Sequence, residues 1–105
     1  MASYRVEVAD EARREIRQVP GNVRQRIVRL LRSLQQEPRP ESSRALDAIK
    51  AGIDLEPGTE LRRVRMASWR VVYLVEVRDA LVVVLAIRQR PPYQYEDLKE
   101  LTSST

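Results

Sequence analysis

The chain has 105 residues, which is enough for one domain with a hydrophobic core and too few for two. It contains neither cysteine nor histidine, so disulfides, thiolate chemistry, cysteine-bound zinc and the usual general base near neutral pH are excluded. The formal net charge is +4, from 19 basic and 15 acidic residues, and every basic residue except Lys50 and Lys99 is arginine. Any chemistry must therefore use arginine, lysine, tyrosine, carboxylates or hydroxyls, and we expect no cofactor and no metal.

The excess of arginine has two explanations that the composition alone does not separate. A genome biased toward arginine codons produces it without any function. Alternatively, the planar and always charged guanidinium is suited to binding phosphate. A positive net charge permits nucleic-acid binding but does not argue strongly for it.

No targeting or membrane segment is predicted. The first fifteen residues mix acids and arginines and lack the apolar stretch of a signal peptide. No segment approaches the roughly 18 apolar residues of a membrane span. We therefore expect a soluble, cytoplasmic protein without a membrane partner.

A strand and two helices are predicted over residues 1–38. Polar and apolar residues alternate over residues 4–8, which is typical of a half-buried strand. Apolar residues then recur at helical spacing after Asp10 and again after Asn22, and both residues are candidate N-caps. Pro20 and Pro38 end the two patterns, so we expect two antiparallel helices joined by a short turn. The second helix has the clearest apolar stripe, formed by Val23, Ile27, Leu30, Leu31 and Leu34.

The second half of the chain predicts three strands and a last helix. Residues 39–60 give a weak signal, with a short element expected around Leu46 and Ile49 inside an exposed loop. Residues 60–66 and 69–77 alternate, whereas residues 80–87 are apolar on both faces and are expected to form the central strand. The polar C-terminal segment, within residues 91–105, predicts a short helix and a tail.

These elements give the order β-α-α-β-β-β-α within a single domain. We expect an α+β fold in which the helix hairpin packs on one face of an antiparallel sheet. The first strand joins that sheet at an edge or in the middle. The other face is expected to be partly uncovered and to carry the arginines of the strands.

The order of elements and three segments resemble the RelE/ParE superfamily, the toxins of bacterial type II toxin–antitoxin pairs. The segments are VEVADEARREIRQVPGNVRQRI, LRRVRMASWRVVYLVE and VVVLAIRQRPPYQY. The first segment is similar to the opening strand and helix hairpin of the family. The second is similar to its basic strand, turn and following aromatic-Arg-x-x-Tyr pattern. The third is similar to its apolar strand that leads into a basic cluster and a tyrosine. The resemblance spans nearly the whole chain and implies the fold more specifically than the target.

Two activities are implied by this resemblance. RelE-like members cut messenger RNA on the ribosome, and their site corresponds by position to Arg63, Arg70, Arg90 and either Tyr93 or Tyr95. ParE-like members lack the cleaving residues and inhibit DNA gyrase. The chain departs from the RelE-like pattern at Leu61, where those enzymes have a lysine, and in the shorter spacing from Arg90 to the tyrosines.

The residues themselves are consistent with RNA cleavage without a metal ion. If the 2′-hydroxyl attacks the adjacent phosphate, arginines can stabilise the charge that develops on the phosphoryl oxygens. Arginine cannot act as the base, because its pKa stays above about 12. Besides a carboxylate, Tyr93 or Tyr95 is then the candidate for proton transfer, provided that neighbouring arginines lower its pKa. We expect the phosphate to be held as well by Arg62, Arg65 and Arg88.

Each of these residues also has a purely structural interpretation. The strand arginines can be solvated side chains of an exposed sheet face, and the tyrosines can pack the last helix onto the sheet. The leading hypothesis is a ribosome-dependent endoribonuclease. The alternatives are a gyrase inhibitor without catalysis and a decayed member that only binds. The family implies an antitoxin partner, expected from the neighbouring gene, with acidic residues that cover the arginines.

Overall fold

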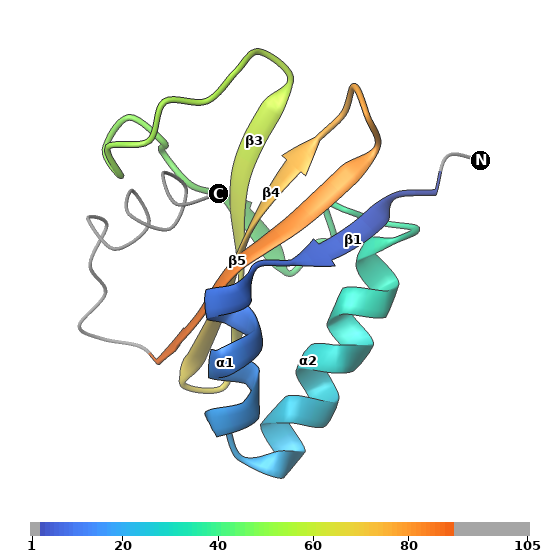
Figure 1. Ribbon diagram of the computed structural model, residues 1–105, viewed down its shortest axis with the longest axis vertical. Helices are drawn as coiled ribbons and strands as arrows, with labels where there is room; N and C mark the ends of the chain where they lie inside the picture. Colours follow the sequence, from blue (N-terminus) through green and yellow to red (C-terminus); the bar gives the residue numbers. More distant parts are fainter. Residues whose placement is uncertain (1–2, 90–105) are drawn as a thin grey trace.

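The computed structural model describes residues 3–89 (Figure 1). The described elements are β1 (Arg5–Val8), α1 (Asp10–Gln18), α2 (Gly21–Leu34), β2 (Ser43–Ala45), β3 (Thr59–Met66), β4 (Trp69–Glu76) and β5 (Leu81–Gln89). The helix predicted within residues 91–105 lies outside the described residues. No helix in the described part of the chain is both long and apolar enough to cross a membrane.

The strands form one sheet in the order β1-β5-β4-β3-β2, and the fold is α+β as predicted. The sheet is mixed, so the expectation of a purely antiparallel sheet was wrong: β1 runs parallel to β5, while all other neighbours are antiparallel. β1 and β5 are neighbours in the sheet but are the first and last described strands along the chain. No hairpin turn joins them directly, so no turn requires them to be antiparallel. The middle strand is β4, and β5 lies between it and β1, which corrects the prediction that residues 80–87 form the central strand.

Both helices begin slightly differently from the prediction. Asp10 is the first residue of α1, and Ala9 is its N-cap; Gly21 begins α2, and Pro20 is its N-cap. Neither cap makes a side-chain hydrogen bond. Boundary shifts of one or two residues are ordinary, because a candidate cap in the sequence can also occupy the first turn.

The inner sides of the helices cover one face of the sheet, which we call the covered face (Figure 1). The predicted apolar stripe of α2 is confirmed: Val23, Ile27 and Leu34 are buried, and Leu30 and Leu31 pack against the same core. Alternating residues along β3, β4 and β5 point toward the helices, and these side chains form the sheet's part of the core. They include Val64, Val71, Tyr73, Val82 and Val84. The helix hairpin thus lies on one side, as its periodicity predicts.

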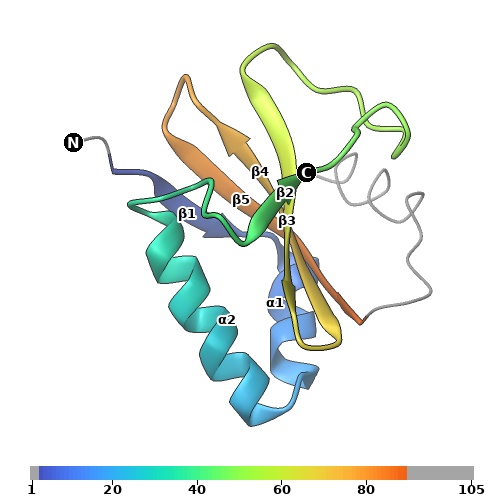
Figure 2. The same ribbon diagram turned by 180° about the vertical axis from the view of Figure 1, so that it is seen from behind.

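A second, smaller core lies on the opposite face, which we call the open face. Here Ala51 and Ile53 of the loop at residues 46–58 are buried against Leu61 and Val72 of the sheet. The short element predicted around Leu46 and Ile49 was wrong, because the regular structure in this region is β2, at the sheet edge opposite to β1 (Figure 2). Ile49 is 88% exposed and belongs to a turn.

Candidate functional site

Three arginines from three neighbouring strands form one row across the open face. The register pairs Arg65 of β3 with Arg70 of β4, and Arg70 with Arg88 of β5. Directly paired residues point to the same side of a sheet, so these three side chains leave the sheet together. Two members of the row, Arg65 and Arg70, flank the short turn at residues 67–68, in which Ala67 has a φ of 54°. That tight turn fixes the pairing of Arg65 with Arg70.

A second row of basic residues lies two positions along the same strands. Arg63 of β3 faces Arg44 of β2 and shares the open face with Arg65, because side chains two residues apart in a strand point to the same side. The two rows are about 7 Å apart, the distance that two residues span in a strand. We call this set the basic face; it consists of Arg44, Arg63, Arg65, Arg70 and Arg88.

The members of the basic face differ in exposure and in their partners. Arg65 is exposed, whereas Arg63 and Arg70 are half-buried. Nη1 of Arg44 donates to the carbonyl oxygens of Glu41 and Ser43 at 2.8 and 2.9 Å, which holds its guanidinium near the start of β2. Several guanidinium groups at one end of a sheet form a concentrated positive surface suited to phosphate oxygens.

Arg88 is tied to the first helix. Its Nη1 lies 3.0 Å from Oε2 of Glu15 in α1, and the other carboxylate oxygen accepts a hydrogen bond of 2.9 Å from the backbone N–H of Ile87. β1 pairs with β5 only as far as Val84, so Glu15 satisfies a backbone donor of β5 beyond the end of that pairing. Glu15 therefore fixes both the end of β5 and the position of Arg88.

Arg62 lies on the other face of the sheet, away from the arginines with which the sequence analysis grouped it. It is paired with Tyr73, and its side chain is only 13% exposed. Its Nε and Nη2 donate to Oγ of Ser43 at 3.0 and 2.8 Å, and its Nη1 lies 2.8 Å from Oε1 of Glu60. We therefore assign Arg62 a structural role and leave it out of the candidate site.

Glu60 joins Arg62 to Arg39 in a small ion-pair cluster. Nε of Arg39 lies 3.0 Å from the carboxylate oxygen that also contacts Arg62. Burial raises the pKa of Glu60, but the hydrogen bonds and the positive charges of the two arginines outweigh burial, so its pKa lies below its ordinary value. The cluster holds the loop at residues 35–42 against β3.

The residues expected to complete the site, Arg90, Tyr93 and Tyr95, lie outside the described residues. Of the tyrosines in residues 3–89, Tyr4 packs against the covered-face core, and Tyr73 is fully buried in it. The Tyr73 hydroxyl donates to the carbonyl of Pro38 at 2.9 Å, and burial raises its pKa. Within residues 3–89 the basic face thus supplies arginines for charge stabilisation and no tyrosine for proton transfer.

Sequence reasoning missed Arg44. Its strand has three residues, which is too short to show the alternation that reveals a sheet face. The adjacent arginines of β3 were found because their strand is long enough for the pattern to be read. In the described part of the chain, no group of acidic side chains is arranged to hold a metal ion.

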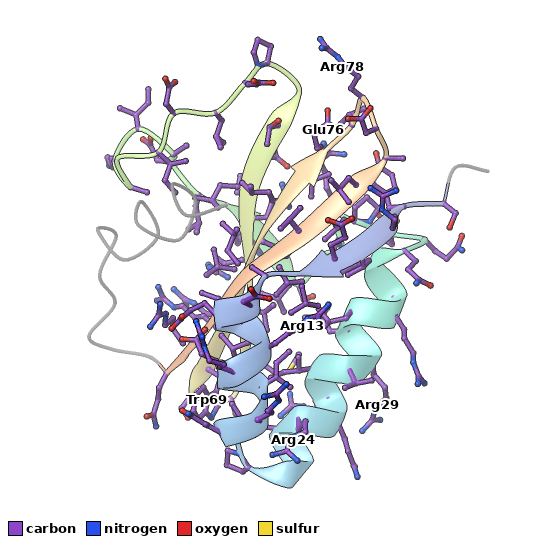
Figure 3. All side chains as sticks on the ribbon, in the orientation of Figure 1. Arg13, Arg24, Arg29, Trp69, Glu76 and Arg78 are labelled. Atoms are coloured by element: carbon purple, nitrogen blue, oxygen red, sulfur yellow. The ribbon has the colours of Figure 1, made fainter. Side chains whose placement is uncertain are left out.

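The opposite end of the open face has a different character. A hollow of about 270 Å³ lies beside the β4–β5 turn, with an apolar floor that includes Leu74 and Val83. Its acidic lining residues are Asp54, Glu56 and Glu76. Figure 3 shows Trp69 and Glu76 at opposite ends of β4. The open face therefore runs from a basic end to an apolar and acidic end.

Solved structures with a similar fold include a RelE toxin and toxin–antitoxin complexes. The chain superimposes on RelE of the RelE–RelB complex from Pyrococcus horikoshii with a TM-score of 0.73 and 21% identity, over 87% of this chain and 99% of that chain. The RelBE2 toxin–antitoxin complex from Mycobacterium tuberculosis gives a TM-score of 0.64 and 21% identity, over 84% and 99% of the two chains. The isolated RelE toxin from Escherichia coli gives 0.61 and 20%, over 97% and 98%. At these identities the likeness concerns the fold.

The family is indicated by the sequence itself. No curated protein matches the chain. Residues 6–91 match the family described as the ParE toxin of the type II toxin–antitoxin system parDE, and this match includes every described strand and helix except the first residue of β1. The chain is therefore a member of the ParE toxin family within the RelE/ParE superfamily of type II toxins.

Proposed function

We propose that this toxin is a ribosome-dependent endoribonuclease that cleaves messenger RNA by attack of the 2′-hydroxyl on the adjacent phosphate. The observation that carries the proposal is the row of Arg65, Arg70 and Arg88, which brings three guanidinium groups from different strands to one end of the open face. Such a row supports binding of a phosphodiester by paired, charge-assisted hydrogen bonds. Arg63 and Arg44 extend the positive surface toward a neighbouring phosphate.

In this mechanism the arginines stabilise the transition state, and another group moves the proton. The phosphoryl oxygens gain charge as the 2′-oxygen attacks, and guanidinium groups held by strands stabilise that charge without rearranging. Arg90 is proposed to join them. As the 2′-oxygen attacks, the bond between phosphorus and the 5′-oxygen breaks, which leaves a 2′,3′-cyclic phosphate. Tyr93 or Tyr95 is proposed to transfer the proton of the 2′-hydroxyl to the departing 5′-oxygen. Glu15 is a positioning residue, because its carboxylate is engaged by Ile87 and Arg88.

Dependence on the ribosome follows from the chemistry available to the chain. Without histidine, the proposed site has no group whose ordinary pKa is near neutrality. Such a site gains most from a substrate that is already aligned, because orientation alone can supply about 7 to 11 kcal/mol of the barrier. A messenger RNA held in the decoding centre provides that alignment. This places the proposed action in the cytoplasm.

The test is a transcript map after induction of the toxin. Primer extension is expected to show discrete cuts within codons for the unaltered chain and their loss in Arg65→Ala/Arg70→Ala, because removal of a single stabilising donor costs about 100-fold or more. Arg78→Ala is the matched control, since Arg78 is an exposed arginine at the β4–β5 turn, far from the row (Figure 3). Cuts that persist in the double variant would refute the role of the row.

The second candidate function is inhibition of DNA gyrase without catalysis. It is favoured by the match to the ParE family and by Leu61, which is 1% exposed at the position where the RelE-like pattern has a lysine. DNA breaks and an induced damage response, with no cuts in the transcripts, would support it. Absence of growth arrest on expression would instead indicate a member that only binds.

A cognate antitoxin is the proposed partner in either case. The similar structures from Pyrococcus horikoshii and Mycobacterium tuberculosis are toxin–antitoxin complexes. We expect a short protein encoded next to the toxin gene, with acidic residues that cover the basic face, because burying arginines without partners is costly. Purification of the two proteins as a complex, and its loss when the acidic segment is deleted, would test this expectation.

A further inference from the structure

Two surfaces on opposite sides of the sheet have complementary character. The first is the hollow of about 270 Å³ at the apolar and acidic end of the open face, which we call the acidic hollow. The second is the outer side of α2, in the helix layer over the covered face, where five residues line a hollow of about 410 Å³. They are Arg24, Gln25, Val28, Arg29 and Arg32, and we call them the α2 patch.

The floor of the acidic hollow is aliphatic. Leu74, Leu81 and Val83 of β4 and β5 line it and are only half-buried, and Ile53 and Leu55 of the neighbouring loop line it as well. No lining residue within residues 3–89 is basic, although the chain carries a net charge of +4. Apolar side chains gathered in a surface hollow mark an interaction site, and the acidic residues beside them select a cationic partner.

Two of the three acidic residues around this floor are available to a partner. The carboxylate of Glu76 caps the β4–β5 turn, because it accepts hydrogen bonds of 3.0 and 2.7 Å from the backbone N–H groups of Arg78 and Asp79. Asp54 and Glu56 are exposed, and neither forms an ion pair within the described part of the chain. These two carboxylates therefore form the acidic rim that a partner can reach.

The α2 patch presents the opposite charge around an aliphatic centre. Val28 is 38% exposed, and Arg24 and Arg32 lie about one helical turn before and after it. Arg24 is engaged, because its guanidinium donates to backbone carbonyls at the end of α1. Arg29 and Arg32 are exposed, and neither forms an ion pair with another residue of 3–89. The patch thus offers one aliphatic side chain and two guanidinium groups.

Val28 suits the acidic hollow better than the other exposed aliphatic side chains do. The large hydrophobic residues exposed in the described ranges are Val28, Ile49 and Val77. Asp47 lies two residues before Ile49, and Asp79 lies two residues after Val77, so each would bring a carboxylate toward the acidic rim. By contrast, α2 contains no aspartate or glutamate. Within residues 3–89, the α2 patch is therefore the surface that combines an exposed aliphatic residue with positive charge alone.

We propose that the α2 patch of one copy of this chain docks on the acidic hollow of a second copy. The aliphatic floor then covers Val28, and the rim carboxylates meet Arg29 and Arg32. Contacts between two α2 patches, or between two acidic hollows, would bring like charges together and are disfavoured. The association is therefore heterologous, which means that each contact uses two different surfaces.

The charged groups of the two surfaces have similar spacings. Asp54 and Glu56 are two residues apart in the chain, so their Cα atoms are at most about 7 Å apart. Arg29 and Arg32 are three residues apart on a helix, which places their Cβ atoms about 5 to 6 Å apart. Both carboxylates can therefore pair with both guanidinium groups in one contact.

Because the two surfaces lie on opposite sides of the sheet, one molecule can use both at once. Figure 3 shows Arg29 of the α2 patch and Glu76 of the acidic hollow on widely separated parts of the molecule. A heterologous contact leaves one unused surface on each outer copy, so further copies add until a ring closes or a filament grows. The expected behaviour is self-association that increases with protein concentration and weakens with salt.

This inference is independent of the proposed cleavage of RNA. It rests on the α2 patch and the acidic hollow, and no residue of either belongs to the basic face. Its readout is the mass of the toxin in solution. A failure of RNA cleavage would leave it testable, and a monomeric toxin would leave the cleavage proposal untouched.

The test is sedimentation equilibrium of the purified full chain over a range of concentrations. Self-association with a dissociation constant of about 10 to 100 µM is expected, because a contact of this size belongs to the weak and transient class. The patch variant, Arg29→Ala/Arg32→Ala, and the hollow variant, Asp54→Ala/Glu56→Ala, are each expected to weaken it about tenfold or more. Val28→Asp should have a similar effect, because it places a carboxylate opposite the acidic rim.

Two double variants are matched controls for the patch variant, because each also removes two arginines. Arg13→Ala/Arg26→Ala changes exposed residues of α1 and α2 outside the patch, and Arg44→Ala/Arg65→Ala changes the basic face. Both are expected to change the dissociation constant by less than about threefold. Thermal melts verify that every variant is folded.

A mixing experiment identifies the heterologous contact. The patch variant keeps an intact acidic hollow, and the hollow variant keeps an intact α2 patch. An equimolar mixture is therefore expected to form a dimer with the affinity of the unaltered chain. That dimer cannot grow, because its two remaining surfaces are the altered ones.

Three results would overturn the proposal. A chain that stays monomeric at about 0.5 mM, well above the expected dissociation constant, would leave the acidic hollow to a basic segment of another protein. Equal losses for the patch variant and Arg44→Ala/Arg65→Ala would assign the contact to the basic face or to net charge. Self-association of the unaltered chain without any dimer in the mixture of the patch and hollow variants would mean that the two surfaces do not meet.

Discussion

The covered face and the open face are formed by the same strands, yet different side chains fill them. On the covered face, both helices close over valines and Tyr73 of the sheet, and Ile27 of α2 is buried in the same core. On the open face, the apolar core under Ile53 occupies only part of the sheet, and arginines take its place toward the β3–β4 turn. Because strand side chains alternate, one strand can serve packing on one face and binding on the other.

Stability and the proposed function therefore depend on different faces of the sheet. Substitutions on the covered face remove buried contacts and are expected to change the free energy of unfolding. Substitution of Arg65, which is exposed, removes charge and little packing, and is expected to change that free energy by less than about 0.5 kcal/mol. Substitution of a residue that links the two regions, such as Glu15, is expected to change the free energy of unfolding by an intermediate amount.

The largest expected effect is that of Ile27→Ala. Ile27 is fully buried between α2 and the sheet, and truncating such a side chain leaves a cavity that costs about 2 to 5 kcal/mol. Urea unfolding followed by circular dichroism measures the change. The neighbouring Val28→Ala is the matched control, because Val28 is 38% exposed, and its cost is expected to stay below about 1 kcal/mol. Equal costs for the two variants would contradict the packing described for α2.

The second effect is that of Glu15→Ala, which removes the contact between α1 and the end of β5. It leaves the Ile87 N–H without its acceptor and Arg88 without its ion-pair partner, so we expect a loss of about 2 kcal/mol. Glu15→Gln should retain the hydrogen bond to Ile87 and recover about half of that loss. Unfolding curves of the two variants separate the backbone contact from the ion pair, and identical losses would mean that only the charge matters.

The third effect is that of Tyr73→Phe. The Tyr73 hydroxyl is the donor for the buried carbonyl of Pro38, and leaving that carbonyl without a partner is expected to cost about 1 kcal/mol. Tyr4→Phe is the matched control, because the Tyr4 hydroxyl has no hydrogen bond to another residue of the described ranges. A change in the urea midpoint for Tyr4→Phe as large as for Tyr73→Phe would show that the hydroxyl bond is not the cause.

Alternation and helical periodicity were sufficient to predict most of the residues buried on the covered face. They could not predict which strands pair when those strands are far apart in the sequence. The strand at residues 69–77 has the faces that its pattern predicts, with Tyr73 inside and Arg70 on the open face. The parallel position of β1 depends on which edge of the sheet it meets, and no local signal encodes that choice. The register shift at Val72 and Tyr73 is likewise a product of packing between β4 and β5.

Arginines whose position follows from alternation within one strand could be grouped from the sequence. An arginine whose position depends on the pairing between two strands could not. Arg63, Arg65 and Arg70 share a face because of alternation within strands and a short turn between them. Alternation also separates Arg62 from Arg63, so grouping both in one site conflicted with the pattern that predicted the strand. Arg44 reaches the basic face only through the pairing of β2 with β3, which the sequence does not reveal.

The smallest effect concerns pH and the cluster around Glu60. Burial raises the pKa of Glu60, but the hydrogen bonds and the charges of Arg62 and Arg39 outweigh burial, so its pKa in the folded chain lies below the ordinary value of 4.5. A lowered pKa means that the unfolded chain binds a proton more readily. The stabilisation by the charged carboxylate is therefore fully present above the pKa of the unfolded chain and is lost as the pH falls through the folded value. The Glu60 side chain is 36% exposed, so solvent screening keeps the contribution below about 1 kcal/mol. Urea unfolding of the unaltered chain and of Glu60→Gln should differ at pH 7 and converge toward pH 3, while the other carboxylates titrate alike in both. A difference that stays constant with pH would show that the charge of Glu60 does not stabilise the fold.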